Sequence, residues 1–211
     1  MIKGNVTVCG TINVSASEKM SKDNEKYLSF SMVVPLQGKD ESVAELMVHV
    51  STPMDAKMKA KLTNGRHVVV HGELHVRKYE GNVYYNVRTN DEVEFVKTSE
   101  PDSLEGDIEF KGGVGPKGVT EKTSKKGTPY HIFDAWSRDK SGDKDAAYTW
   151  VHFLSFQKDF PSLSPKDYVH VTGKLDLDIF KGNANINCIA DKVEIVTFDN
   201  NKQAGKQEDG K

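Results

Sequence analysis

Apolar and polar residues alternate along most of the chain, and this alternation predicts strands. Side chains in a strand point to opposite faces in turn, so a half-buried strand shows a period of two. The expected strands of the first half are 4–14, 27–36, 44–51, 67–77 and 83–96. Those of the second half are 107–119, 129–138, 147–155, 167–177 and 184–197.

One short helix interrupts this pattern in the first half only. Pro53 to Leu62 is followed by Asn64-Gly65, and proline near the start with glycine past the end is typical of a helix. The matching stretch of the second half contains Pro161 and Pro165, which disfavour a helix. The helix is therefore expected between the third and fourth strands of the first half alone.

The two halves repeat each other. Val48-His49-Val50 returns as Val151-His152-Phe153, and Val70-His71-Gly72-Glu73-Leu74 returns as Val171-Thr172-Gly173-Lys174-Leu175. Five strands with an element between the third and fourth are the layout of the OB-fold, a small, partly open barrel. The sequence thus predicts an all-β protein of two tandem five-stranded OB-fold barrels. Their expected bounds are 1–98 and 107–198, with a linker at 99–106 and a disordered polar tail at 199–211.

Composition and charge narrow the function. The 211 residues are 36% hydrophobic and 28% charged, as in ordinary globular proteins. No apolar run resembles a secretion signal or a membrane span, so we expect a cytoplasmic protein. The net charge of −2 means that any binding of phosphate depends on local cations. Cys9 and Cys188 belong to no paired-cysteine motif and are expected to be core residues.

The sequence contains no motif typical of an enzyme, a cofactor site or a metal site. The chain has no phosphate-binding Gly-x-x-x-x-Gly-Lys-Ser/Thr loop and no nucleophile elbow, and the glycine-rich segment 112–118 suits a strand bulge. His67, His71 and His75 share one side of an expected strand. At the rise of a strand, residues four positions apart are about 13 Å from each other, which is too far for them to bind one metal ion. We therefore expect no catalysis, no cofactor, no metal and no small-molecule substrate.

Several segments resemble the bacterial single-stranded DNA-binding proteins. They are Gly65 to Tyr79, with its strand running into Arg-Lys-aromatic, the tryptophan segments Trp136 to Lys140 and Trp150 to Lys158, and Phe30-Ser31-Met32. The resemblance implies sequence-tolerant binding and protection of single-stranded DNA in replication, recombination or repair. It also implies that the aromatic residue ending the first segment stacks on a base. The last residues, 207–211, lack the hydrophobic tip through which that family recruits partners.

Two groups of residues are the candidate DNA contacts. In the first half they are Arg77, Lys78 and Tyr79, in an expected loop before the fifth strand. In the second half they are Trp136, Arg138, Trp150, His152 and Phe156. Large apolar groups fall on both faces of strand 147–155, which indicates that one face meets a ligand or another unit. Exposed rings with nearby cations suit single-strand binding.

Other interpretations stay open. The lysines of the flanking loops (Lys117, Lys122, Lys125, Lys126, Lys140 and Lys144) suit phosphate contact, but Asp139, Asp143 and Asp145 are typical of an ordinary solvated loop. The chain could be a protein-interaction or assembly module, since OB-folds host many functions. Binding of RNA and formation of a homodimer are also compatible with the sequence.

Overall fold

The computed structural model describes residues 1–38, 43–138, 148–180 and 182–197, and all elements named below lie in these ranges. The strands are β1 (Ile2–Met20), β2 (Lys26–Gln37), β3 (Val43–Pro53), β4 (His67–Tyr79), β5 (Asn82–Arg88), β6 (Glu94–Phe95), β7 (Ser103–Thr123), β8 (Pro129–Arg138), β9 (Tyr148–Ser155), β10 (Tyr168–Phe180) and β11 (Asn183–Ile195). The helix is α1 (Ala56–Lys61). The expected tail at 199–211 lies outside the described residues.

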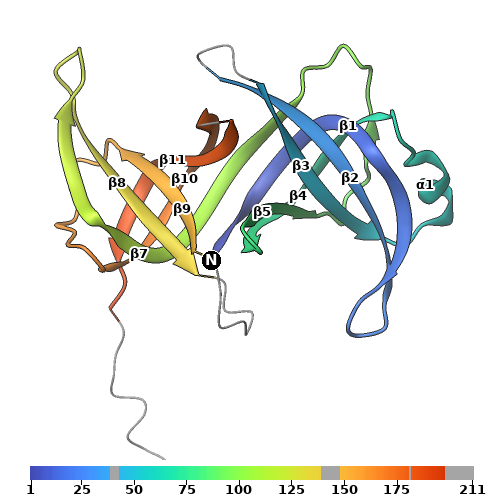
Figure 1. Cartoon of the computed structure of the whole chain (residues 1–211), viewed down its shortest axis with the longest axis horizontal. Coiled ribbons are helices and arrows are strands. Elements are labelled where there is room, and N and C mark those ends of the chain that lie inside the picture. Colours follow the sequence, from blue (N-terminus) through green and yellow to red (C-terminus); the bar gives the residue numbers. More distant parts are fainter. Residues whose placement is uncertain (39–42, 139–147, 181, 198–211) are drawn as a thin grey trace, which may run out of the picture.

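Each half closes into a barrel of five strands, and the predicted fold class is confirmed. Figure 1 shows the two barrels. In barrel 1, β1 pairs with β2, β2 with β3, β3 in parallel with β5, β5 with β4, and β4 again with β1. In barrel 2, β7, β8, β9, β11 and β10 pair in the same order and close back on β7. The helix lies between β3 and β4, as in the OB-fold.

The inward side chains of both barrels form the core. Phe30, Val48 and Val70 are buried in barrel 1, and Phe110 and Phe153 are buried in barrel 2. Cys9 and Cys188 are also buried, as the sequence predicted. Because every second residue of a strand is used in this way, the residues between them project from the outer face of each barrel.

The two barrels share one continuous sheet, since β1 pairs antiparallel with β7 from Ile2 opposite Phe110 to Cys9 opposite Ser103. Gly4 and Gly106 make this close approach possible. A Cβ on Gly4 would lie 1.9 Å from the carbonyl oxygen of Asp107, and one on Gly106 would lie 2.2 Å from that of Asn5. Strand β7 begins at Ser103, within the stretch 99–106 that was expected to link the two barrels.

Three local features differ from or refine the sequence prediction. The helix begins after Asp55, whose carboxylate accepts hydrogen bonds from the backbone of Lys57 (2.7 Å) and Met58 (3.1 Å), rather than at Pro53. The expected strand 83–96 is divided into β5 and β6. The glycine-rich segment of β7 leaves its register with β8 between Val114 and Val119, which confirms the predicted bulge.

Candidate nucleic-acid interface

The outer face of barrel 2 gathers large rings on β8 and β9. Three cross-strand pairs lie on this face: Trp136 with Trp150, Asp134 with His152, and Ile132 with Leu154. The exposed fractions are 47% for Trp150, 51% for Phe156 and 46% for Tyr148. Together with Tyr130 and Ile189 these residues form what we call the aromatic face. The structure thus brings the four predicted residues Trp136, Trp150, His152 and Phe156 to one surface.

Contacts between the rings order this surface. Trp136 meets Tyr148 edge-to-face at 5.0 Å between ring centroids, and Tyr130 lies 5.6 Å from Phe156. A Cβ on Gly113 would lie 2.6 Å from the Trp136 indole, so that ring lies directly on the backbone of β7. The predicted Arg138 is exposed at the end of β8, opposite Tyr148. Edge-to-face and tilted ring pairs of this kind are favourable contacts that hold the rings in place.

The outer face of barrel 1 carries cations instead. A cavity of about 670 Å³ opens there. It is lined by Ser51, His75, Arg77, Lys78, Tyr79, Tyr84, Asn86, Val87 and Arg88. We call this cavity the basic groove, because Arg77, Lys78 and Arg88 give it three positive charges and no carboxylate lines it. The predicted residues Arg77, Lys78 and Tyr79 all border it.

The expected loop at Arg77, Lys78 and Tyr79 is wrong, because these residues are the end of β4. Arg77 lies opposite Tyr84 on β5, Lys78 opposite Val83, and Tyr79 opposite Asn82. The turn of this hairpin is Glu80-Gly81, both with positive φ, of 48° and 82°. Strand alternation therefore places Arg77 and Tyr79 on the outer face, and Lys78 between them also borders the basic groove. Tyr79 is 53% exposed.

A histidine lies beside the basic groove. The Nδ1 atom of His49 on β3 is hydrogen-bonded to the Ser31 hydroxyl at 2.9 Å. The centroids of the His49 and Tyr84 rings are 6.0 Å apart. Burial lowers the pKa of His49 below its ordinary value of 6.5. The imidazole is therefore neutral at pH 7 and adds a polar ring rather than a charge to this face.

Sequence reasoning missed several residues of both faces: Tyr84, Arg88, Tyr130, Asp134 and Tyr148. Tyr84 and Arg88 follow the same alternation as Asn86 within β5, which could have assigned them to one side. The cross-strand register that brings them next to Arg77 and Ser51 is set by the folded sheet. A single sequence does not contain that register.

The other predicted features have separate environments. Lys122, Lys125 and Lys126 are exposed around the β7–β8 hairpin, whereas Lys140 and Lys144 lie outside the described residues. His67 is buried and bonds to the Thr11 hydroxyl (3.0 Å) and to the carbonyl oxygen of Glu100 (3.1 Å). Within the described ranges, three or more histidine, cysteine or acidic side chains nowhere gather as a metal site would require.

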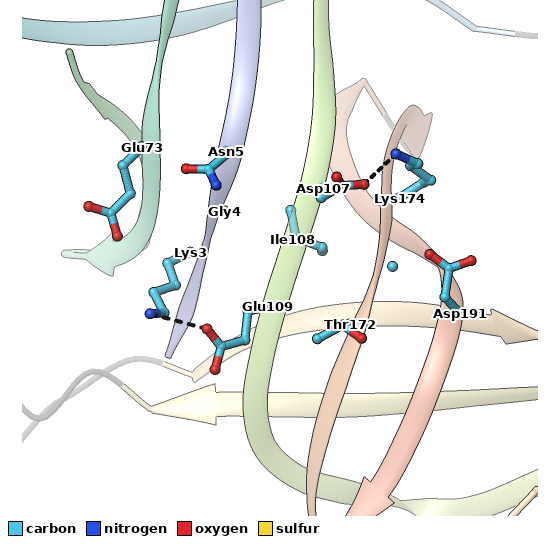
Figure 2. A pocket seen from close by; sticks show the side chains of 11 residues that line it. Lys3, Gly4, Asn5, Glu73, Asp107, Ile108, Glu109, Thr172, Lys174 and Asp191 are labelled. Carbon is cyan, nitrogen blue, oxygen red and sulfur yellow. Dashed lines mark ion pairs between the residues drawn. The ribbon is translucent and has the colours of Figure 1, made fainter. Parts of the chain in front are cut away.

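Another cavity, of about 440 Å³, lies where the barrels join (Figure 2). Its two lysines are paired with carboxylates, Lys3 with Glu109 at 3.1 Å and Lys174 with Asp107 at 2.5 Å. Glu73 and Asp191 add further negative charge to its lining. Hydrogen bonds from Lys111 and from Lys3 lower the pKa of Glu109 to about 2, against the opposing effect of burial. Carboxylates outnumber cations here, so this cavity repels phosphate.

Comparison with known proteins gives structural likeness only. No protein-family model and no curated protein matches the chain. The chain is similar to the single-stranded DNA-binding protein of Thermus aquaticus, with 15% identity over 98% of this chain and 96% of the other and a TM-score of 0.47. It is also similar to the small single-stranded DNA-binding protein of Streptomyces coelicolor, with 18% identity over 44% of this chain and 94% of the other and a TM-score of 0.37.

A membrane-crossing helix is not found in the parts of the chain that the structure describes.

Proposed function

We propose that this protein binds single-stranded DNA without strong sequence preference and without catalysis. Bases stack on the aromatic face of barrel 2, and cations of the basic groove on barrel 1 meet the phosphates. The observation that carries this proposal is that Tyr148, Trp150 and Phe156 remain about half exposed on one face of a sheet. Flat rings held in this way contribute about 1–3 kcal/mol per stacked base and tolerate any sequence.

The geometry favours a single strand over a duplex. Bases in a duplex are stacked on each other and cannot reach a protein ring, whereas those of a single strand can. The groove supplies Arg77, Lys78 and Arg88 within one cavity despite the net charge of −2. Contacts to phosphate release counterions, so binding is expected to weaken as salt rises. In the cell, such binding would protect or present single strands during replication, recombination or repair.

A second function, protein interaction or assembly, is favoured by one observation. Ile132, Leu154 and Ile189 lie on the same face as the rings, and Ile189 is 46% exposed. Aliphatic side chains add nothing to base stacking but are common where proteins meet. In this alternative the aromatic face binds another protein, either a different one or a second copy of this chain.

Tryptophan fluorescence distinguishes the two functions, because both tryptophans of the chain lie on the aromatic face. Adding oligothymidine is expected to dim the emission, and raising the salt concentration is expected to restore it. Trp150→Phe should remove most of the change and weaken binding only modestly, since a phenyl ring still stacks. Duplex DNA should change the emission little. An RNA oligomer of the same length tests whether the protein distinguishes ribose from deoxyribose.

Two outcomes would contradict the proposal. Tight binding without any tryptophan response would move the contact away from the aromatic face, and light scattering would then test whether that face joins two copies of the chain. Absence of binding to any single strand at low salt would leave the protein-interaction alternative.

A further inference from the structure

A carboxylate lies in the middle of the aromatic face. Asp134 on β8 is opposite His152 on β9, and its Oδ1 contacts the His152 Nδ1. Barrel 1 has a neutral pair at the matching place, Ser31 with His49 at 2.9 Å. A carboxylate repels phosphate, so contact with the DNA backbone does not account for Asp134. The edge of a base carries N–H donors, and an ionised carboxylate is a pure acceptor.

Asp134 borders a small cavity of about 250 Å³. The cavity is lined by Gly115, Pro116, Lys117, Gly118, Asp134 and Trp150. Its volume is below the roughly 300–1,000 Å³ of pockets for drug-sized ligands and suits one planar ring system. Lys117 and Asp134 place opposite charges in the lining, while Trp150 supplies an aromatic wall.

The bulge of β7 keeps this cavity open. The strand leaves its register with β8 after Val114 and regains it at Val119, and the backbone of Val114 bonds to Asp167 (2.8 Å) and Lys166 (3.0 Å). A Cβ on Gly115 would lie 3.1 Å from the Trp150 ring and 3.0 Å from the carbonyl oxygen of Asp134. Any larger residue at this position would therefore press into the space beside the indole.

The four bases differ in what they offer a carboxylate. Guanine presents a ring N–H and an amino group side by side, which matches the two oxygens of one carboxylate. Cytosine and adenine offer an amino group next to an acceptor nitrogen, and thymine offers one ring N–H between two carbonyls. Each carboxylate oxygen has two lone pairs, so Oδ1 can keep its contact with His152 and also accept from a base. Lysine in turn donates well to guanine O6 and N7.

We propose that this cavity is a guanine subsite within the single-strand interface. Asp134 accepts from the ring N–H and amino group of guanine, Lys117 donates to its opposite edge, and Trp150 forms the wall against its plane. His152 is a positioning residue that holds the carboxylate. The proposal rests on the proposed function, because the guanine is part of a bound strand. It adds a preference at one subsite to binding that is otherwise sequence-tolerant.

Competition between oligonucleotides tests this subsite with the full chain. Three strands of equal length are compared: oligothymidine, the same strand with interspersed guanines, and the same strand with inosine at those positions. Inosine lacks only the amino group of guanine. The guanine strand is expected to bind about five- to tenfold more tightly than the inosine strand. In Asp134→Asn the ratio of the guanine-strand affinity to the inosine-strand affinity should fall to about one, whatever change the variant makes in the affinity for oligothymidine.

Asp176→Asn is the matched control, since Asp176 is an exposed carboxylate on β10 of the same barrel but does not line the cavity. This variant should keep the preference for guanine. Guanosine monophosphate should compete weakly, because it lacks the rest of the strand.

Equal binding of the guanine and inosine strands by the unaltered protein would overturn the subsite, as would an unchanged preference in Asp134→Asn. Strong competition by guanosine monophosphate would identify a pocket for a free nucleotide instead. In each of these cases quenching of tryptophan by oligothymidine would leave the proposed function standing. Failure of all three strands to bind would overturn both.

Discussion

The outer faces of the two barrels carry different chemistry on the same backbone. At one matching pair of positions on the third strands, barrel 1 has Met47, opposite Val33, and barrel 2 has Trp150, opposite Trp136. On the fourth strands, Arg77 of barrel 1 matches Asp178 of barrel 2, opposite Tyr84 and Asn185 respectively. The core constrains only inward residues, so the outward ones are free to diverge. Aromatic rings have gathered on one barrel and cations on the other.

The largest expected effect is at Trp150. Trp150→Ala should weaken binding of oligothymidine by about 2–3 kcal/mol, because a whole stacking surface is lost. Fluorescence anisotropy of a labelled oligomer measures this change. Met47→Ala, at the matching position of barrel 1, should have little effect. Equal losses of affinity in both variants would show that the two barrels contribute equally to base stacking.

A smaller effect is expected at the cationic face. Arg77→Ala should weaken binding by about 1 kcal/mol and lower the slope of log affinity against log salt by about 1, because one phosphate contact disappears. Titrations at several salt concentrations give that slope. Asp178→Ala removes a charge at the matching position of barrel 2 and should preserve or strengthen binding. A steeper loss in Asp178→Ala than in Arg77→Ala would reverse the assignment of the two faces.

Glu109 lies at the joint where both barrels share one sheet, and its ion pairs are expected to stabilise this joint. Glu109→Gln removes the ion pairs with Lys3 and Lys111 and should lower the free energy of unfolding by about 1–2 kcal/mol at pH 7, a value reduced for partial exposure. The pKa of Glu109 is lowered from 4.5 to about 2, so its contribution is complete above pH 4.5 and is lost as pH falls toward 2. Urea unfolding at pH 7 and near pH 2 measures this difference.

The control for Glu109 is Glu121→Gln, an exposed carboxylate at the far end of β7, which should leave the stability nearly unchanged. A Glu109→Gln penalty that persists undiminished near pH 2 would exclude the carboxylate charge as its cause.

The smallest expected effect is at Trp136. Its ring lies on Gly113 and against Tyr148, and it is less exposed than Trp150. Trp136→Phe should therefore keep most of the fluorescence change on addition of oligothymidine and alter the affinity by less than about 0.5 kcal/mol. Loss of most of the signal in this variant would make Trp136, rather than Trp150, the main stacking residue.

The sequence was sufficient for the strands and for most of the aromatic face, because both follow alternation within one strand. Alternation along β9 puts Trp150 and His152 on the same side, and they lie opposite Trp136 and Asp134 of β8. Of the cations of the basic groove, the sequence predicted Arg77 and Lys78 but not Arg88. Arg88 lies on β5, and the strand pairings that bring it to the groove cannot be inferred from alternation within one strand. The turn of the hairpin, Glu80-Gly81, is only two residues long, so β4 continues through Arg77 to Tyr79 where the sequence predicts a loop.

The pairing of β1 with β7 has a consequence for the order of folding during synthesis. Residues 2–9 are paired on one side by β4 and on the other by β7, which follows them by about a hundred positions. Until residue 110 has left the ribosome, this edge of the first barrel has no partner, and an unpaired edge is a template for wrong strand pairing. Such long-range pairing also slows folding. Once it has formed, a chain cleaved between residues 97 and 102 should still migrate as one particle, because the sheet rather than the linker holds its halves together.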